Sequence, residues 1–104
     1  MSKHLLDNKS FLDLLLSTST EQALSLLQTV TKDQLLLLSE IAKNILVLPL
    51  PKRGQLYVNK KKKLFVRLAD KKLSRTKKLS LVHKNARYLL NTLLSLKAQL
   101  QSLQ

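Results

Sequence analysis

Leucine occupies 29 of the 104 positions of this chain, whereas glycine occurs once and proline twice. Leucine loses little side-chain freedom in a helix, and few residues here would interrupt one. Sandwiches and barrels need turn residues and β-branched strands, so this composition argues against them. The chain length suits one domain. We therefore expect an all-α domain.

The spacing of the apolar residues predicts four or five helices. Three short helices are expected over residues 3–17, 19–30 and 32–48, a basic helix over 60–70, and a long helix over 74–102. The expected architecture packs the short N-terminal helices against the long C-terminal helix, with the lysine-rich segment between them.

Helix starts are indicated where a hydroxyl residue is followed three positions later by Glu or Gln, the spacing of a capping box. Thr18 with Glu21 and Thr31 with Gln34 have this spacing. Ser74 is the expected N-cap of the long helix. Two such pairs in a row favour short, closely packed helices.

Residues 49–58 are predicted to form a linker, because Pro49 and Pro51 cannot continue a helix and Gly54 follows them. The linker would separate a neutral leucine-rich part, residues 1–48, from residues 59–104. The latter part would hold the basic helix and the long helix, and both parts would belong to one compact domain.

The last expected helix carries apolar residues at alternating spacings of three and four from Leu79 onward, the a/d pattern of heptads. One interpretation is a long helix that completes the core. A second is self-association through a coiled coil, and a third is a mixed arrangement in which the tail is exposed to a partner. The candidate interface residues are Leu89, Leu93, Leu96, Leu100 and Leu103.

The net charge of +13 is confined to the second half of the chain. Residues 1–48 hold four Lys and five acids, whereas residues 49–104 hold fifteen Lys and Arg and a single acid, Asp70. Such asymmetry indicates a polyanionic partner, with nucleic acid first and an anionic membrane ranked below it. The alternative is a solvated face that serves solubility.

Lysine outnumbers arginine 11 to 4 in the basic half. Lysine is a point charge, whereas arginine makes the bidentate contacts that read guanine, so we expect backbone binding with little base reading. Lys60, Lys63 and Arg67 would share one stripe of a helix, which Lys71 would extend. The candidate nucleic-acid-binding residues are Lys60, Lys61, Lys62, Lys63, Arg67, Lys71, Lys72, Arg75, Lys77 and Lys78.

Other functional classes lack the residues that they need. Without cysteine there is no disulfide scaffold and no cysteine-based zinc site. His4 and His83 have no acid at ligand spacing, so neither a metal nor another cofactor is expected. No catalytic constellation or phosphate-binding glycine loop is present, and an enzyme is not expected. Because no apolar run approaches about 18 residues and no signal-peptide pattern is seen, we expect an intracellular protein.

Several short motifs accompany the basic block. They are Asn44-Ile45-Leu46, Pro49-Leu50, a lysine run ending in Leu64, Arg67-Leu68-Ala69, Lys71-Lys72, Ser74 and Lys77-Lys78. Over about residues 20–82 the chain resembles a family of small basic proteins encoded beside capsid genes by Maverick/Polinton-type mobile elements and adintoviruses. Some of them have been likened to the adenovirus core protein X. The resemblance implies a viral or mobile-element core protein that binds packaged DNA in the virion or the host nucleus.

The sequence thus leads to two functional hypotheses. The first is a DNA-binding and DNA-condensing protein that contacts double-stranded DNA without sequence preference. The alternative is a helical adaptor that docks on a capsid or another acidic partner and oligomerises through the C-terminal heptads. The run Lys60–Lys63 also has the composition of a nuclear-localisation signal.

Overall fold

The computed structural model describes residues 8–102, and every regular element within that range is an α-helix. In chain order the helices are α2 (Lys9–Ser17), α3 (Thr20–Gln28), α4 (Lys32–Val47), α5 (Lys52–Lys60), α6 (Lys62–Ala69), α7 (Arg75–Lys84), α8 (Ala86–Ser95) and α9 (Lys97–Ser102). The all-α prediction is confirmed. The prediction of four or five helices is wrong, because the described residues form eight.

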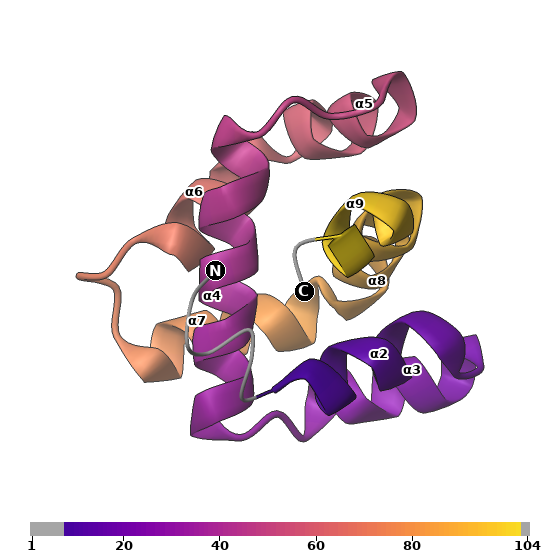
Figure 1. Ribbon diagram of the computed structural model, residues 1–104. Helices are drawn as coiled ribbons and strands as arrows, with labels where there is room; N and C mark the ends of the chain where they lie inside the picture. The colour runs from indigo at the N-terminus through magenta and orange to yellow at the C-terminus, as the bar shows by residue number, and fades with distance from the viewer. Residues whose placement is uncertain (1–7, 103–104) are drawn as a thin grey trace.

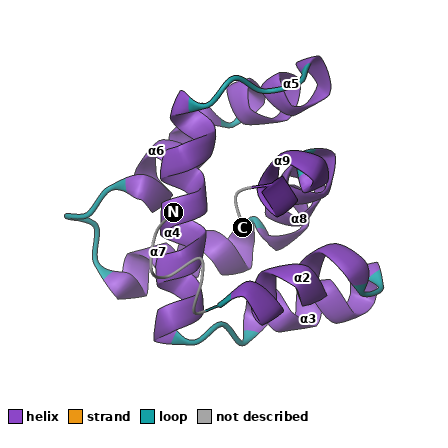
Figure 2. Cartoon of the chain, in the orientation of Figure 1, coloured by secondary structure: helices purple, strands orange, loops and turns teal. Residues whose placement is uncertain are grey.

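Helix α4 stands at the centre of the arrangement (Figure 1). Helix α6 packs along α4, and α7 contacts both of them. Helix α8 lies between α5 and the α2–α3 pair, so these helices form successive tiers beside α4. The loop between α6 and α7 projects at the left of the view (Figure 2).

The hydrophobic core is built from both halves of the chain. Leu37, Leu38 and Ile41 of α4 are all buried on one face of the helix, and α4 has several neighbouring helices. Phe65 and Leu68 of the basic half belong to the same cluster. The neutral and basic parts therefore differ in charge but share one core.

The long C-terminal helix expected over residues 74–102 is not formed. A straight helix of that length would measure about 42 Å, and the largest extent of the molecule is 32 Å. The chain bends at Asn85, whose side-chain Nδ2 donates to the carbonyl of Leu81 at 2.9 Å. It bends again at Leu96, whose N–H donates to the carbonyl of Leu93 (3.1 Å), three residues back instead of four. The segment becomes α7, α8 and α9.

These bends place the heptad leucines inside the chain. Leu89, Leu93, Leu96 and Leu100 are each no more than 4 % exposed, because α8 lies between α5 and the α2–α3 pair. These four leucines are core residues in this structure. They are not exposed as the candidate interface requires. Leu103 lies outside the described residues.

Two of the predicted helix starts are confirmed. Thr31 Oγ1 accepts from the N–H of Gln34 at 3.2 Å, and Gln34 Oε1 accepts from the N–H of Thr31 at 3.0 Å, a complete capping box. Ser74 Oγ accepts from the N–H of Lys77 at 3.3 Å and caps α7. These caps fix where α4 and α7 begin.

The predicted start at Thr18 is wrong by one residue. Ser19 is the N-cap of α3, and its hydroxyl accepts from the N–H of Gln22 at 3.2 Å. Thr18 is instead the C-cap of α2, and its N–H donates to the carbonyl of Leu14 at 3.0 Å. Glu21 therefore has no capping-box partner at Thr18.

The linker predicted over residues 49–58 is much shorter than expected. Pro51 is the N-cap of α5, so helix begins at Lys52. Gly54 lies inside this helix, and a Cβ there would be 2.3 Å from Leu96 Cδ2. The glycine therefore permits α5 to pack closely on the bend between α8 and α9, and it does not mark a turn.

Candidate nucleic-acid interface

The run of four lysines spans a break between two helices. Lys60 ends α5, Lys61 has non-helical dihedrals of φ −128° and ψ 46°, and α6 begins at Lys62. The single stripe predicted for Lys60, Lys63 and Arg67 is therefore divided. Lys63 and Arg67 lie one turn apart on α6, and Lys60 belongs to α5.

Tyr88 of α8 contacts the chain at this break between α5 and α6. Its hydroxyl donates to the carbonyl of Tyr57 at 2.6 Å, one of the last carbonyls of α5, which helix ends leave without an intrahelical partner. The ammonium of Lys61 lies 4.7 Å from the centre of the Tyr88 ring and donates to Asn85 Oδ1 at 3.2 Å. Lys61 is thus directed toward α8, although it remains exposed.

Helices α6 and α7, with the loop of residues 70–74, form a basic hairpin. Helix α6 buries Leu64, Phe65 and Leu68 and exposes its opposite side. We call the exposed Lys and Arg residues of this segment the hairpin cations. They are Lys62, Lys63, Arg67, Lys71, Lys72, Arg75, Lys77 and Lys84.

The loop of the hairpin is organised by its acidic residue. Asp70 Oδ1 accepts from the backbone N–H of Lys72 at 2.9 Å, and the Asp70 carbonyl accepts from the N–H of Leu73 at 3.2 Å. Because α6 ends at Ala69, Lys71 lies in the loop and does not extend the row of α6. The carboxylate of Asp70 bonds the backbone, and both loop lysines are exposed.

Lys78 does not belong to this exposed surface. Its side chain is only 8 % exposed, and its Nζ donates to the Ser39 hydroxyl of α4 at 3.3 Å. The structure therefore places it inside, at a contact between α7 and α4, apart from the neighbouring Lys77.

Lys84 was not among the candidate residues, yet it is exposed at the end of α7. It lies seven residues after Lys77, and residues seven apart share a face of a helix. The spacing of seven residues from Lys77 could have identified Lys84 from the sequence.

Neither Tyr57 nor Phe65 offers a free stacking surface. Phe65 is 1 % exposed and belongs to the core. The ring of Tyr57 packs edge-on against Tyr88, with 5.9 Å between ring centres and 72° between ring planes. Stacking on bases is not supported by this arrangement.

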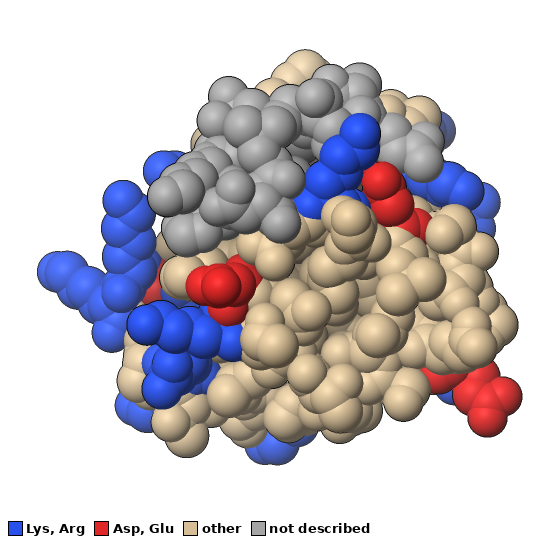
Figure 3. Space-filling model, turned by 60° about the horizontal axis from the view of Figure 1, so that its bottom comes forward, with Lys and Arg blue, Asp and Glu red and all other residues tan. Residues whose placement is uncertain are grey.

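The surface formed by α2 and α3 is poor in cations. Helix α3 contains no Lys or Arg, and α2 contains only Lys9. In Figure 3, which turns the bottom of Figure 1 forward, tan covers the middle of the face, while blue gathers toward its edges and most densely at the left. The cations of the protein are therefore unevenly distributed over its surface.

Within residues 8–102 no group of three or more His, Cys, Asp or Glu could hold a metal ion. His83 is exposed, and its carbonyl accepts from Gln28 Nε2 at 3.3 Å, while His4 lies outside the described residues. In the same range no single helix is long and apolar enough to cross a membrane. Helices α4 and α5 meet the length and composition criteria only as a pair bent by 114°.

Comparison with protein-family models, with curated proteins and with solved structures gives no match for this chain.

Proposed function

We propose that this protein binds the phosphate backbone of double-stranded DNA without sequence preference, through the hairpin cations. The observation that carries the proposal is their concentration. Eight exposed cations lie between Lys62 and Lys84, and Asp70 is the one acid in that stretch of sequence. Such a surface attracts a polyanion because one acid in this stretch offsets eight cations.

Phosphate neutralisation gives this binding a characteristic dependence on salt. Each phosphate that a cation neutralises releases condensed counterions, so the logarithm of affinity falls linearly with the logarithm of salt concentration. If about five hairpin cations contact phosphates, the slope should be about −4.5. Binding would therefore be tight at low salt and weak at high salt.

The residue types favour contact with the duplex backbone over reading of bases. Only Arg67 and Arg75 among the hairpin cations could make bidentate contacts to guanine. Single-strand binders combine cations with aromatic stacking platforms. Phe65 is buried and Tyr57 packs on Tyr88, which supports a duplex as the ligand.

The burial of the C-terminal leucines does not support the alternative function, an adaptor that oligomerises through them. Leu89, Leu93, Leu96 and Leu100 are buried within the chain and are not available to a second copy. A membrane role is also left aside, since the apolar residues of α4 form the core.

A role beside a packaged genome, in a virion or a host nucleus, extends this proposal. Its support is the resemblance over about residues 20–82 to the small basic proteins of Maverick/Polinton-type elements. A protein with such a role would need DNA binding that is independent of sequence, and the hairpin cations would supply it.

The test measures affinity for two duplexes of unrelated sequence between about 50 and 200 mM salt. Neutralising Lys62→Gln, Lys63→Gln and Arg67→Gln together should weaken binding by about tenfold or more and reduce the slope by about 2.7. Both duplexes should be bound equally well.

The matched control removes the same number of charges elsewhere, with Lys9→Gln, Lys43→Gln and Lys97→Gln, which are exposed on α2, α4 and α9. It should leave the slope nearly unchanged. Equal losses in the two triple variants would show that net charge alone matters and would contradict the hairpin assignment. Absence of binding at low salt would overturn the proposal.

A further inference from the structure

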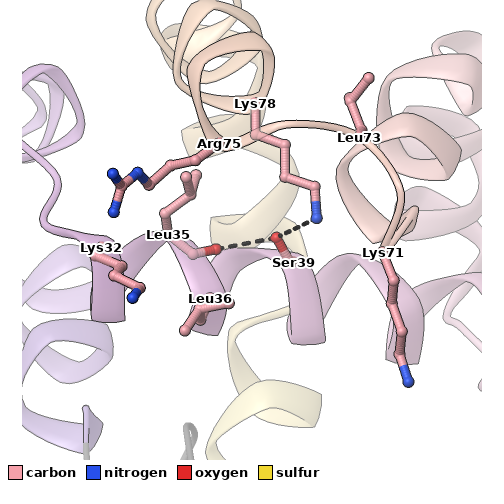
Figure 4. Close-up of a pocket in the computed structure, with 8 residues that line it drawn as sticks. All are labelled: Lys32, Leu35, Leu36, Ser39, Lys71, Leu73, Arg75 and Lys78. Carbon is pink, nitrogen blue, oxygen red and sulfur yellow. Dashed lines mark hydrogen bonds between the residues drawn. The ribbon is translucent and has the colours of Figure 1, made fainter.

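A pocket of about 410 Å³ lies between the first turns of α4 and the beginning of α7 (Figure 4). It is separate from the outward surface of the hairpin cations, although two of them stand at its rim. Its volume is in the range of pockets that hold small organic ligands. Its lining combines four positive charges with an apolar wall.

Four cations line the pocket. Arg75 and Lys32 lie at one end, Lys71 at the other, and Lys78 between them (Figure 4). None of the described residues that line the pocket is acidic. The first residues of α7 are also here, and their N–H groups give a helix start partial positive charge. The pocket therefore favours an anion of more than one charge.

Lys78 is the innermost of these cations. It is 8 % exposed and makes no ion pair with an acid among residues 8–102. Its Nζ donates to Ser39 Oγ at 3.3 Å, and this hydroxyl in turn donates to the carbonyl of Leu35 at 3.1 Å. An ammonium has three donors, so two remain for a ligand. Lys78 thus lacks a counter-charge among the described residues, and a bound anion would supply one.

The remaining lining is apolar. Leu35 is buried, Leu36 is 36 % exposed, and Leu73 is half-buried, and all three line the pocket. A simple inorganic anion would leave this wall in contact with water. A ligand with a flat or apolar part beside its anionic group would cover it.

We infer that this pocket binds a nucleotide through a terminal phosphate, with the phosphate beside Lys78 and Arg75 and the base against the leucines. A terminal phosphate carries nearly two negative charges, which suits the four cations better than one carboxylate does. A phosphate inside a duplex is flanked by sugars on both sides and carries a single charge, so it suits the four cations less well than a terminal phosphate does.

Two kinds of ligand carry a nucleotide with a terminal phosphate. One is a 5′-phosphorylated DNA end with an unpaired nucleotide, and the other is a free mononucleotide. The first rests on the proposed DNA binding, because Lys71 and Arg75 join the pocket to the hairpin cations. The second does not depend on it.

The first experiment titrates the full chain with 5′-AMP and with adenosine at low salt, followed by calorimetry or NMR shifts. We expect 5′-AMP to bind and adenosine to bind at least about tenfold more weakly. Lys78→Met keeps the length of the side chain and removes its charge, and it should weaken 5′-AMP binding by about tenfold. Lys84→Met, on the same helix but outside the pocket, should change it by less than about twofold.

A second variant covers the case in which Lys78→Met does not fold. Arg75→Gln changes an exposed residue at the rim and should weaken 5′-AMP binding by about threefold or more with an unchanged thermal midpoint. Equal binding of adenosine and 5′-AMP, no binding of 5′-AMP, or equal effects of the pocket and control variants would each overturn the inference.

The second experiment compares duplexes whose single-nucleotide 5′ overhangs carry or lack the phosphate, with closed circular DNA as a ligand without ends. Preference for the phosphorylated end, lost in Lys78→Met, identifies the DNA end as the source, whereas 5′-AMP binding without that preference identifies the free nucleotide. Salt-dependent binding of circular DNA tests the hairpin cations separately. Its loss would contradict the proposed function and leave the 5′-AMP result standing.

Discussion

At the scale of single residues, Tyr88 determines how the lysine run is presented. Its ring packs on Tyr57 and lies beneath the ammonium of Lys61, and its hydroxyl bonds the Tyr57 carbonyl. This one side chain therefore contacts both the last turn of α5 and the first residue after it. In the sequence, Tyr88 lies in a leucine-rich segment and belongs to no motif. Its role depends on Tyr57, which lies 31 positions earlier in the chain.

Tyr88→Phe should lower the free energy of unfolding by about 1 kcal/mol, because the part-buried Tyr57 carbonyl loses its partner. Chemical denaturation near neutral pH would measure it. Tyr57→Phe is the control, since no hydrogen bond of its hydroxyl is found among the described residues, and it should cost less than about 0.5 kcal/mol. An equal cost for both variants would contradict the role of the Tyr88 hydroxyl.

The natural protein and the Tyr88→Phe variant should also respond differently to alkaline pH. Burial raises the pKa of Tyr88 above its usual 10.0, and neighbouring Tyr57 raises it further. Between the unfolded and the folded pKa the folded state holds the extra proton, so stability is fully present below pH 10 and falls as pH rises above it. The advantage of the natural protein over Tyr88→Phe should therefore shrink above pH 10.

At the scale of elements, the C-terminal heptads show what an apolar pattern can and cannot establish. The alternating spacing correctly predicted helix and correctly selected the buried positions Leu89, Leu93 and Leu100. It did not predict the bends, because Asn85 and Leu96 have only modest effects on helix propensity. Each bend also makes a contact that is distant in sequence: Lys61 donates to Asn85, and Leu96 packs against Gly54 of α5.

Two adjacent leucines distinguish core from interface. Leu93→Lys should abolish cooperative unfolding, a loss above about 4 kcal/mol, because Leu93 is 3 % exposed and the new charge would be buried. Leu94→Lys should be tolerated, since Leu94 is 39 % exposed. Thermal unfolding and light scattering would show the result. A folded Leu93→Lys protein with reduced molecular mass in solution would mean that Leu93 lies at an interface.

At the scale of the whole molecule, the two parts of the chain that differ most in charge share a single core. Helix α4 comes from the neutral part and α6 from the basic part, and they pack along one another. The cations of α6 and α7 are thereby brought onto one hairpin with few acids to offset them. Mutual repulsion among such charges destabilises the folded state and is screened by salt.

The thermal midpoint should therefore rise with salt, by about 5 °C between about 20 and 500 mM NaCl. The triple variant Lys62→Gln, Lys63→Gln and Arg67→Gln should start from a higher midpoint and rise less. The triple control at Lys9, Lys43 and Lys97 should resemble the natural protein more closely. A midpoint that falls with added NaCl would contradict repulsion among the hairpin cations.

The sequence alone determined the helical class, the capping of α4 and α7, and the segment in which the cations lie. These features depend on local propensities and on spacing within a few residues, which the chain carries directly. Only the tertiary structure decided that the chain breaks at Lys61, Asn85 and Leu96, that Lys78 is enclosed while Lys77 is exposed, and that the heptad leucines form the core. Each of these depends on partners distant in sequence, such as Ser39 for Lys78 and Tyr57 for Tyr88, and no local pattern encodes such contacts.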